Sequence, residues 1–399
     1  MVTWEQKELI DVLKQHITDG PHETPKIMKE GIPFISVEAI VNNKIDFKRK
    51  RGYISNEYNE KCNQKYKPQK NDVYLVKSGS TVGKTAIVET NIPFNIWSPL
   101  AALRPNNATS PYFLFYLLQT DNLQSQVINK SKGGTQPNLS MRLLEHFKIF
   151  VPNNIDYQTQ IARLLINVDK IISLQQRKLN ELKEVKKTLL SQLFPSKGQY
   201  RPIIRFKKFT NKWTKRKLGN IAKIIGGGTP STSNHDYWNG NINWYSPTEI
   251  GNNIFVNSSN KKISIKGLNN SSAKLLPGGK TILFTSRAGI GNMAIMLTDG
   301  CTNQGFQSWV IDDTKIDIYF LYSLGRLLKH DAIRQASGST FLEISNKEVK
   351  KLLLEIPSFT EQKLIGNMLR KIDDDIVRQK ERIILITKIK KNLLQKLFV

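Results

Sequence analysis

Four consecutive cationic residues, Lys48 to Arg51, are followed at Tyr53 by an aromatic ring. Ammonium and guanidinium groups suit phosphate oxygens, so the cluster predicts contacts to a nucleic-acid backbone. A charged loop that only faces water is the alternative interpretation of this cluster taken alone. The rest of the chain must therefore be considered before either interpretation of the cluster, as a nucleic-acid contact or as a solvent-facing loop, is preferred.

Two polar loops occupy equivalent places near the start of each half of the chain, at Asp19 to Pro25 and Gly226 to Ser231. Proline makes such a loop rigid, and glycine lets its backbone come close to a groove. Asn303 and Gln304 offer amides that suit adenine, and Arg287 offers a fork of donors that suits guanine. Taken singly, each of these residues is better explained as an ordinary turn or cap. The predicted DNA-binding residues are His22, Thr24, Lys48, Arg49, Arg51, Ser78, Lys84, Gln136, Thr229, Ser231, Arg287, Asn303, Gln304 and Thr340.

The segment from Gly79 to Thr85 resembles a phosphate-binding P-loop, because it places glycines at 79 and 83 before Lys84. A Walker A loop needs four residues between its glycines, and this segment has three. The equivalent segment of the second half, Arg287 to Asn292, has no lysine. We therefore predict a glycine-rich turn between two strands rather than a nucleotide site.

No other motif predicts catalysis. The sequence has no Pro-Pro dipeptide, so it lacks the Asn/Asp-Pro-Pro-aromatic element of enzymes that methylate bases with S-adenosylmethionine. Glu5-Gln6-Lys7 and Glu361-Gln362-Lys363 superficially resemble a nuclease triad. Both are predicted to begin helices and neither has a partnered acidic residue, so we interpret them as helix-start residues. We predict a non-catalytic chain with no cofactor of its own.

The composition limits the class of protein that positions these residues. The chain has 399 residues, a formal net charge of +27 and a pI near 9.9. Such a charge predicts a polyanionic partner, with nucleic acid favoured over a membrane surface. No apolar run approaches a transmembrane span, and Met1 to Gly20 shows no signal-peptide pattern. Cys62, Cys301 and the five histidines show no metal-ligand spacing, so we expect a basic cytoplasmic protein without a metal.

An apolar stripe with steps of three and four residues runs from Tyr157 to Phe194, and the last forty residues repeat it 204 positions later. Its polar interruptions, a glutamine and a lysine, fall at the same places in both copies. This spacing is typical of coiled-coil helices. An amphipathic helix packed on its own domain is the alternative, which two matched stripes disfavour. The apolar seam residues are Ile161, Leu165, Val168, Ile172, Leu179, Leu182, Leu189, Leu193, Ile365, Leu369, Ile372, Ile376, Ile383, Ile386, Leu393 and Leu397.

The duplication extends through the segments before these helices. Trp4 to Val12 matches Trp213 to Ile221, and a helical segment at Tyr112 to Ile128 recurs at Tyr319 to Ala336. Short β-rich runs lie at Asp72 to Val76, Thr85 to Val88 and Thr281 to Thr285. We predict α+β lobes at 1–152 and 200–357, a first long helix with its connector at 153–199, and a second long helix at 358–399.

The connector limits how the helices can pair. Pro195 to Ile204 spans at most about 35 Å, whereas a helix of roughly 38 residues is about 57 Å long. The second lobe must then start near the far end of the first helix. The second helix can bury its stripe only by running back along the first. We expect a long antiparallel pair with a lobe at each end and a pseudo-two-fold axis.

Over essentially its whole length the chain resembles the specificity subunit of type I restriction–modification systems. The most specific matches are Asp19 to Pro25, Trp213 with Lys217-Leu218-Gly219, Thr302 to Phe306, Ser337 to Ser345, Ile356-Pro357 and Glu361-Gln362. The resemblance implies two target-recognition domains that each bind one half of a bipartite double-stranded DNA sequence. It also implies that the helices fix the spacer between half-sites. Methyltransferase subunits that use S-adenosylmethionine on adenine would dock there, and restriction subunits that hydrolyse ATP would join them.

Two departures and two alternatives accompany this resemblance. The first lobe has Tyr157-Gln158 where the family has Glu-Gln, and the usual segment before Trp4 is nearly absent. The tyrosine is a minor departure that leaves the helix start in place, whereas the short segment before Trp4 predicts that the start of the first lobe is less well anchored. A related system, in which one partner chain both methylates and cleaves, would give nearly the same sequence. A stand-alone nucleic-acid-binding scaffold would explain the charge and the helices without modification partners.

Overall fold

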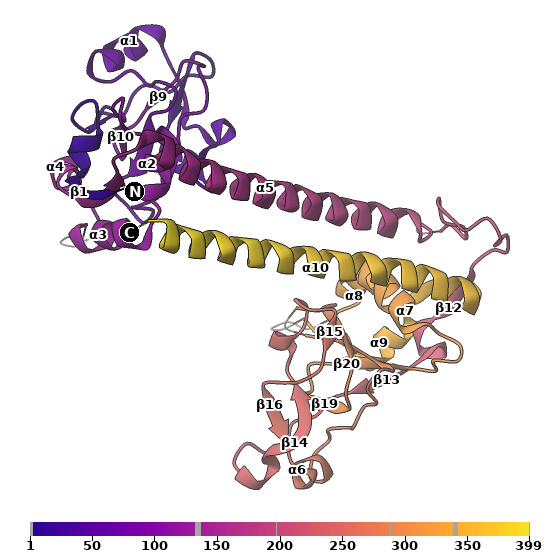
Figure 1. Ribbon diagram of the computed structural model, residues 1–399. Coiled ribbons are helices and arrows are strands. Elements are labelled where there is room, and N and C mark those ends of the chain that lie inside the picture. Colours follow the sequence, from indigo (N-terminus) through magenta and orange to yellow (C-terminus); the bar gives the residue numbers. More distant parts are fainter. Residues whose placement is uncertain (1–2, 132–136, 197, 288, 338–341, 399) are drawn as a thin grey trace. The chain divides into compact units, whose positions relative to one another are not determined.

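The computed structural model describes residues 3–131, 137–196, 198–287, 289–337 and 342–398 (Figure 1). The chain divides into two compact units. Unit 1 comprises Met1–Gln176 with Glu381–Val399, and unit 2 comprises Arg177–Lys380. The division passes through both long helices, α5 (Ile155–Gln192) and α10 (Phe359–Leu397), so each unit holds one lobe and part of each helix.

Lobe one, in unit 1, mixes short strands with short helices. Its strands are β1 (Trp4–Glu8), β2 (Thr18–Asp19), β3 (Ile32–Ile35), β4 (Ile40–Val41), β5 (Lys44–Ile45), β6 (Gly52–Ile54), β7 (Val73–Val76), β8 (Thr85–Ile87), β9 (Asn95–Ile96), β10 (Leu100–Leu103) and β11 (Lys148–Pro152). Its helices are α1 (Asn56–Lys65), α2 (Pro111–Leu117), α3 (Asp121–Lys130) and α4 (Met141–Glu145), with 3-10 turns η1 (Leu9–Val12), η2 (Val37–Ala39) and η3 (Phe47–Arg49).

Lobe two, in unit 2, has a closely similar set of elements. Its strands are β12 (Thr214–Lys217), β13 (Ala222–Gly226), β14 (Trp238–Tyr245), β15 (Phe255–Val256), β16 (Lys261–Ile263), β17 (Thr281–Phe284), β18 (Met293–Met296), β19 (Gly300–Thr302), β20 (Gln307–Ile311) and β21 (Leu353–Ile356). Its helices are α6 (Ile265–Asn269), α7 (Ile318–Gly325), α8 (Lys329–Arg334) and α9 (Asn346–Lys351), with 3-10 turns η4 (Leu218–Asn220), η5 (His235–Tyr237), η6 (Pro247–Glu249) and η7 (Arg326–Leu328).

The two lobes share one strand order. An antiparallel sheet runs β2-β10-β7-β8 in lobe one and β13-β20-β17-β18 in lobe two, where β15 extends it in parallel. A second sheet is β6-β3-β9 in one lobe and β16-β14-β19 in the other, with one antiparallel and one parallel pairing in each. The duplication thus includes the fold of the lobes, and the mixture of helix and sheet confirms the α+β class.

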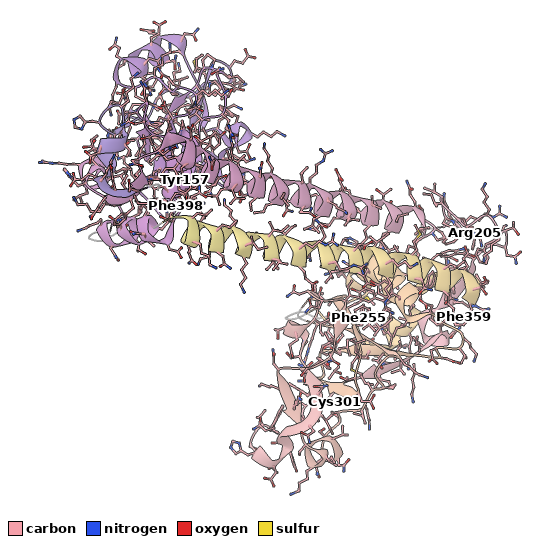
Figure 2. All side chains as sticks on the ribbon, in the orientation of Figure 1. Tyr157, Arg205, Phe255, Cys301, Phe359 and Phe398 are labelled. Atoms are coloured by element: carbon pink, nitrogen blue, oxygen red, sulfur yellow. The ribbon has the colours of Figure 1, made fainter. Side chains whose placement is uncertain are left out.

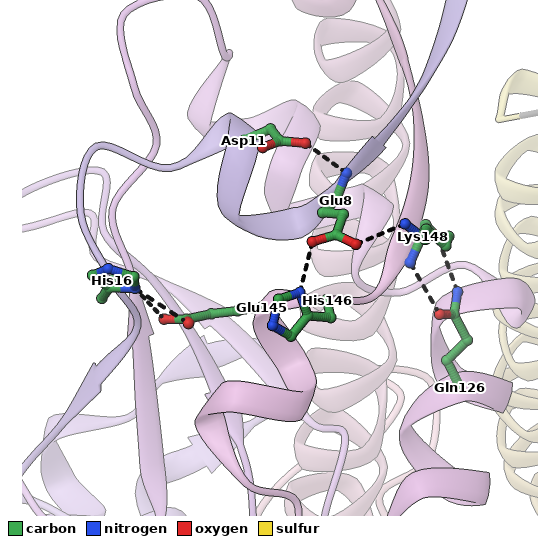
Figure 3. A network of polar contacts seen from close by, with 7 residues as sticks. All are labelled: Glu8, Asp11, His16, Gln126, Glu145, His146 and Lys148. Atoms are coloured by element: carbon green, nitrogen blue, oxygen red, sulfur yellow. Dashed lines mark hydrogen bonds and ion pairs between the residues drawn. The ribbon is translucent and has the colours of Figure 1, made fainter.

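In each lobe, the first and last strands pair with each other. β1 pairs with β11 in lobe one, and β12 pairs with β21 in lobe two, both antiparallel. Figure 3 shows the polar contacts that support the first of these pairs. The Glu8 carboxylate lies 2.6 Å from Nδ1 of His146 and 2.7 Å from Nζ of Lys148. Hydrogen bonding from Lys148 and then from His146 lowers the pKa of Glu8, so its carboxylate stays charged against β11.

Two expectations about local structure are wrong. Glu5-Gln6-Lys7 lies inside strand β1 rather than at the start of a helix, because its backbone pairs with β11 from the far end of the lobe. The helical segment expected from Tyr112 to Ile128 is two helices, α2 and α3. The Thr120 side chain caps α3 by accepting from the backbone N–H of Leu123, which starts a new helix at that point. The matching segment of lobe two is also divided, into α7 and α8, but there the 3-10 turn η7 connects the two helices and no side chain of the described residues caps α8.

The core of each unit joins its lobe to the long helices through one apolar helix. In unit 1, α2 contributes Phe113, whose ring centroid lies 5.0 Å from that of Phe398. Phe398 directly follows α10 and is labelled in Figure 2. In unit 2, Phe194 follows α5. Its ring centroid lies 6.2 Å from that of Trp213 and 5.6 Å from that of Phe320 on α7. Removing a buried aromatic side chain from such a core costs about 3–5 kcal/mol.

A buried glutamine fixes the start of each long helix. The Gln158 side chain accepts from the backbone N–H of Ser110 and donates to the carbonyl of Pro152, both at 2.9 Å. Gln362 makes the same two contacts at 3.1 Å, with Asp317 and with the proline that follows β21. Each glutamine thereby ties a long helix to the N-terminus of α2 or α7. Along both helices, every predicted apolar seam residue is buried or half-buried.

Candidate nucleic-acid interface

The glycine-rich segment forms the turn of the β7–β8 hairpin, which confirms the predicted strand connection. Gly79 and Gly83 both adopt a φ of +90°, a conformation that L side chains rarely adopt. A Cβ on Gly83 would also lie 2.5 Å from Oε1 of Gln124. Lys84 follows the turn and is exposed. Its ammonium group is thus presented to solvent from a rigid hairpin.

An open cleft of about 1090 Å³ lies beside this hairpin. Three predicted DNA-binding residues, Arg49, Ser78 and Lys84, line it together with Lys50. The structure therefore brings together residues from η3 and from the hairpin that are about 30 positions apart in the sequence. Cations and a hydroxyl around an open cleft suit the phosphate backbone of a nucleic acid.

The other cations of the Lys48–Arg51 cluster lie on the same lobe. Arg51 stacks its guanidinium on the ring of Trp97, 3.9 Å from the centroid. Stacking on the ring fixes the orientation of the guanidinium, and its N–H donors, which lie in the guanidinium plane, stay available to other groups. Lys48 is exposed in η3, a turn that the Asp46 carboxylate caps by accepting from the Lys48 backbone N–H at 3.0 Å.

Asp19 is fully buried and has three basic side chains around it. Lys65 Nζ lies 2.5 Å from Oδ1, while Lys77 Nζ and His22 Nε2 each lie 3.2 Å from Oδ2. The imidazole of His22 also contacts the Ser98 hydroxyl at 3.0 Å. One carboxylate thus faces two lysines and a histidine, and the Lys65 and His22 side chains are 50% and 71% exposed. This surplus of positive charge at the surface suits an anionic ligand.

The glycines of the two polar loops approach the lobes themselves rather than a groove. A Cβ on Gly20 would lie 1.9 Å from the carbonyl oxygen of Ile96, and one on Gly227 would lie 1.9 Å from that of Asn303. A Cβ on Gly228 would lie 2.2 Å from the hydroxyl oxygen of Ser272. Contacts within each lobe therefore explain why these positions need glycine, and groove contact through the two loops stays a prediction. The small size of the glycines holds each loop tightly against its own sheet.

In lobe two, the predicted residues Thr229 and Gln304 meet, because the Thr229 hydroxyl donates to the side-chain carbonyl of Gln304. Asn303 uses its side-chain oxygen to accept from the backbone N–H of Gly305 at 2.8 Å, so this oxygen shapes the turn. Arg287 is half-buried beside that turn, where a Cβ on Gly305 would lie 3.2 Å from its Nε. These loops present amide, hydroxyl and guanidinium groups close together.

The remaining predicted residues are more scattered. The exposed Ser231 contacts Ser233 at 2.8 Å through its hydroxyl, and its carbonyl accepts from the indole N–H of Trp238 at 3.0 Å. Thr24 is exposed next to Glu23, which pairs with Lys61. Gln136 and Thr340 lie outside the described residues.

Sequence reasoning did not identify Lys65, Lys77 or Trp97 as parts of this surface. Lys65 is 46 positions from Asp19, so no local spacing connects them. Asp19 itself belongs to the Asp-Gly-Pro-His motif, at the start of its loop. A buried carboxylate at such a position needs basic partners. The sequence shows Asp19 within its motif, but the burial of Asp19 and the identity of its lysine partners are visible only in the structure.

Two repeated lobes that expose cationic and amide-bearing loops on a strongly basic chain define a nucleic-acid-recognition protein. A family model described as the type I restriction modification DNA specificity domain matches residues 1–184 and 210–387. The chain belongs to this family and carries its domain twice.

Relatives and solved structures agree with this assignment. The MjaX specificity subunit of Methanocaldococcus jannaschii is 28% identical over 397 residues, which cover 95% of this chain and 89% of the relative. The EcoR124I/EcoR124II specificity subunit of Escherichia coli is 27% identical over 220 residues, 52% of this chain and 54% of the relative. The S subunit structure from M. genitalium matches with a TM-score of 0.64 at 16% identity, and the match covers 100% of this chain and 96% of that chain. The structural match supports the fold.

Family membership makes the chain a non-catalytic DNA-recognition subunit of a type I restriction–modification system. Specificity subunits of this family need no cofactor of their own. In the part of the chain that the structure describes, no helix has the length and apolarity to cross a membrane.

Proposed function

We propose that the chain recognises a bipartite double-stranded DNA sequence and that each lobe binds one half-site. The observation that carries the proposal is the repetition of one strand order, with its loops, in both lobes. Equivalent positions in those loops differ. The backbone N–H of Lys77 donates to the carbonyl of Pro99, after β9, and that of Ser286 donates to the carbonyl of Gly305, after β19, both at 2.8 Å. Because these two contacts are equivalent, the residues that follow, Ser78 in lobe one and Arg287 in lobe two, occupy corresponding positions. A hydroxyl and a guanidinium recognise different base edges, so the two half-sites should differ in sequence.

The side chains that we assign to DNA binding follow from exposure and charge. In lobe one they are His22, Thr24, Lys48, Arg49, Arg51, Ser78 and Lys84, and in lobe two they are Thr229, Ser231, Arg287, Asn303 and Gln304. Lysine and arginine at the open cleft bind phosphates, and amides in the loops of lobe two bind base edges. Gln136 and Thr340 keep this assignment as predictions from the sequence.

We further propose that α5 and α10 form one long antiparallel coiled coil with a pseudo-two-fold axis. The burial of the predicted seam residues supports this arrangement. Contacts within each unit support it too, since a lysine of one long helix pairs with an aspartate of the other in unit 1 and again in unit 2. The length of the coiled coil would then set the spacer between the half-sites. The domain boundaries that we propose remain 1–152, 153–199, 200–357 and 358–399.

The partners that we propose are methyltransferase and restriction subunits. Exposed apolar residues on the long helices within unit 1 support a docking role, since Leu174, Ile384 and Leu385 are 62%, 68% and 58% exposed. S-adenosylmethionine would be bound by the methyltransferase subunits, and ATP by the restriction subunits. The assembly would act in the cytoplasm, where its DNA substrate lies.

Co-expression tests the proposed function. The chain and its methyltransferase subunit are produced together in a host that lacks adenine methylation, and the methylated adenines are mapped. We expect a two-part sequence with a spacer of fixed length, and no methylation from the methyltransferase subunit alone. A single uninterrupted motif, or methylation that is independent of this chain, would contradict the proposal.

A further inference from the structure

Two lysines at the apolar seam, Lys186 and Lys390, lie 204 residues apart and have matching surroundings. In unit 2, Nζ of Lys186 on α5 lies 2.5 Å from Oδ1 of Asp373 on α10. In unit 1, Nζ of Lys390 on α10 lies 2.8 Å from Oδ1 of Asp169 on α5. The lysine side chains are only 15% and 13% exposed. Each pair therefore joins the two long helices from within their seam.

A tyrosine from the adjoining lobe completes each pair. Tyr319 of α7 donates its hydroxyl to Oδ2 of Asp373 at 2.6 Å, and Tyr116 of α2 donates to Oδ2 of Asp169 at 2.8 Å. Both tyrosines are buried, which raises the pKa of each hydroxyl and keeps it protonated as a donor. One aspartate in each unit thus contacts both long helices and the lobe. We call these sets, Lys186–Asp373–Tyr319 and Lys390–Asp169–Tyr116, the polar clusters.

Stability alone does not explain the polar clusters. The loss of hydration offsets most of the attraction between two buried charges, so apolar residues at the same places are often as stabilising. Burial lowers the pKa of Lys186, which reflects that loss of hydration, while the contact with Asp373 acts in the opposite direction. Leucine or isoleucine would have continued the seam. A single lysine within a coiled-coil seam instead specifies the register of the helices.

The apolar seam by itself permits other registers. A slip of one heptad along the helix axis moves the partners by about 10 Å and still places apolar residues opposite one another. Along DNA, this distance corresponds to about three base-pair steps of 3.4 Å. In a slipped register, Lys186 and Lys390 would both lose their aspartates, which leaves buried charges without partners. The tyrosines add a second constraint, because they hold α7 and α2 to the same carboxylates.

We propose that the two polar clusters are positioning elements for DNA recognition. They fix the register of α5 against α10 and the rotation of each lobe about the helices, and so limit the chain to one spacer length between half-sites. The inference rests on the proposed bipartite recognition and adds the side chains that set its geometry. None of these six residues needs to touch DNA.

The test compares three variants of the full chain in complex with the methyltransferase subunit. The apolar variant combines Lys186→Met, Lys390→Met, Asp169→Leu, Asp373→Leu, Tyr116→Phe and Tyr319→Phe. A milder variant carries Tyr116→Phe and Tyr319→Phe alone, so that a readout remains if the apolar variant does not fold. The matched control combines Lys187→Met and Lys391→Met, which remove lysines that are 80% and 66% exposed and also lie 204 residues apart.

Methylation rates are measured on duplexes that share both half-sites and differ in spacer length by single base pairs. We expect the natural chain and the control to lose at least about 100-fold in rate when the spacer changes by three base pairs, the change that a one-heptad slip would accommodate. In the apolar variant this loss should fall below about tenfold, with both half-sites still required, and the tyrosine variant should be intermediate. The melting temperature of the apolar variant should equal or exceed that of the natural chain, because no buried charge remains.

Two outcomes separate this inference from the proposed function. If the natural chain shows no dependence on spacer length, bipartite recognition itself is wrong. If the natural chain depends on the spacer and both folded variants retain the full 100-fold discrimination, the polar clusters do not position the lobes and the inference is overturned.

Discussion

Arg205 and Glu361 form a two-pronged ion pair across 156 residues, with Nε and Nη2 of the arginine each 2.8 Å from a carboxylate oxygen. The side chain of Glu361 is 1% exposed and that of Arg205 is 13% exposed. The same carboxylate accepts from the indole N–H of Trp213 at 3.4 Å. The pair thus ties the segment before β12 to the first turn of α10. In lobe one, Tyr157 takes the place of the glutamate and packs edge-on against Trp4, with ring centroids 6.5 Å apart.

Glu361→Ala should lower the free energy of unfolding of unit 2 by about 3 kcal/mol or more, because it leaves the Arg205 guanidinium buried without its partner. Denaturant unfolding followed by tryptophan fluorescence would measure the change. Asp375→Ala on the same helix removes an exposed pair with Arg378 and should change stability by about 0.5 kcal/mol or less. Equal effects of the two substitutions would show that burial of the first pair has no energetic role.

Cys301 should be unreactive in the native chain. Its burial raises the pKa of the thiol to about 12, so at pH 8 only about one thiol in ten thousand is ionised. Cys62 is also buried and its pKa is also raised by burial. We expect less than about a tenth of an equivalent of thiol to react with a disulfide reagent at pH 8, and both thiols to react in denaturant. Rapid modification of a full equivalent in the folded chain would contradict the packing around β19.

The purified chain should not bind ATP, because Gly79 to Lys84 is a tight hairpin and not a phosphate-binding loop. It should not bind S-adenosylmethionine, because the sequence lacks the Asn/Asp-Pro-Pro-aromatic element. Isothermal titration with each ligand would detect binding. Lys84→Ala should instead weaken DNA binding roughly equally for all sequences and lower the salt dependence by about one phosphate contact. Saturable nucleotide binding that Lys84→Ala removes would show that this hairpin has been misinterpreted.

Exchange of residues 205–357 for the corresponding segment of a relative should change one half of the methylated sequence and leave the other half intact. The reason is that β12 pairs with β21, so the exchanged segment enters and leaves lobe two at neighbouring strands. Mapping of methylated adenines in cells that express the hybrid chain would show the result. A hybrid in which both halves change together would mean that the lobes do not act independently.

Insertion of four helix-forming residues into both long helices, after Gln176 and after Lys380, should lengthen the spacer by one or two base pairs. Four residues add about 6 Å and roughly 40° beyond one full turn. One base-pair step adds about 3.4 Å and roughly 34°. Methylation of duplexes with graded spacers is the measurement, and the chain without insertions is the control. An unchanged preferred spacer would show that the helices do not set the distance.

Periodic and local signals predicted much of this structure. α5 and α10 begin and end close to the predicted limits, because a seam repeated every three or four residues is visible in one stretch of sequence. The break before α3 was also visible in principle, since Thr120 followed by Asp121 is a typical helix start. The assignment of Glu5 to a helix failed because the identity of β1 depends on β11, more than 140 residues away. The lysine partners of Asp19 escaped prediction for the same reason, since Lys65 of α1 is 46 residues away and Lys77 follows β7.

The polar clusters also bear on how such a chain could arise. Each long helix carries both partners of the contact, with Asp169 and Lys186 on α5 and Asp373 and Lys390 on α10, at the same separation of 17 residues. A helix of this kind is self-complementary, because two copies laid antiparallel would form the same lysine–aspartate pair twice about a two-fold axis. A shorter ancestor with one lobe and one helix would therefore carry both partners of this ion pair and would form it twice in a symmetric homodimer. Gene duplication and fusion would then join the two subunits and free each lobe to diverge toward its own DNA sequence.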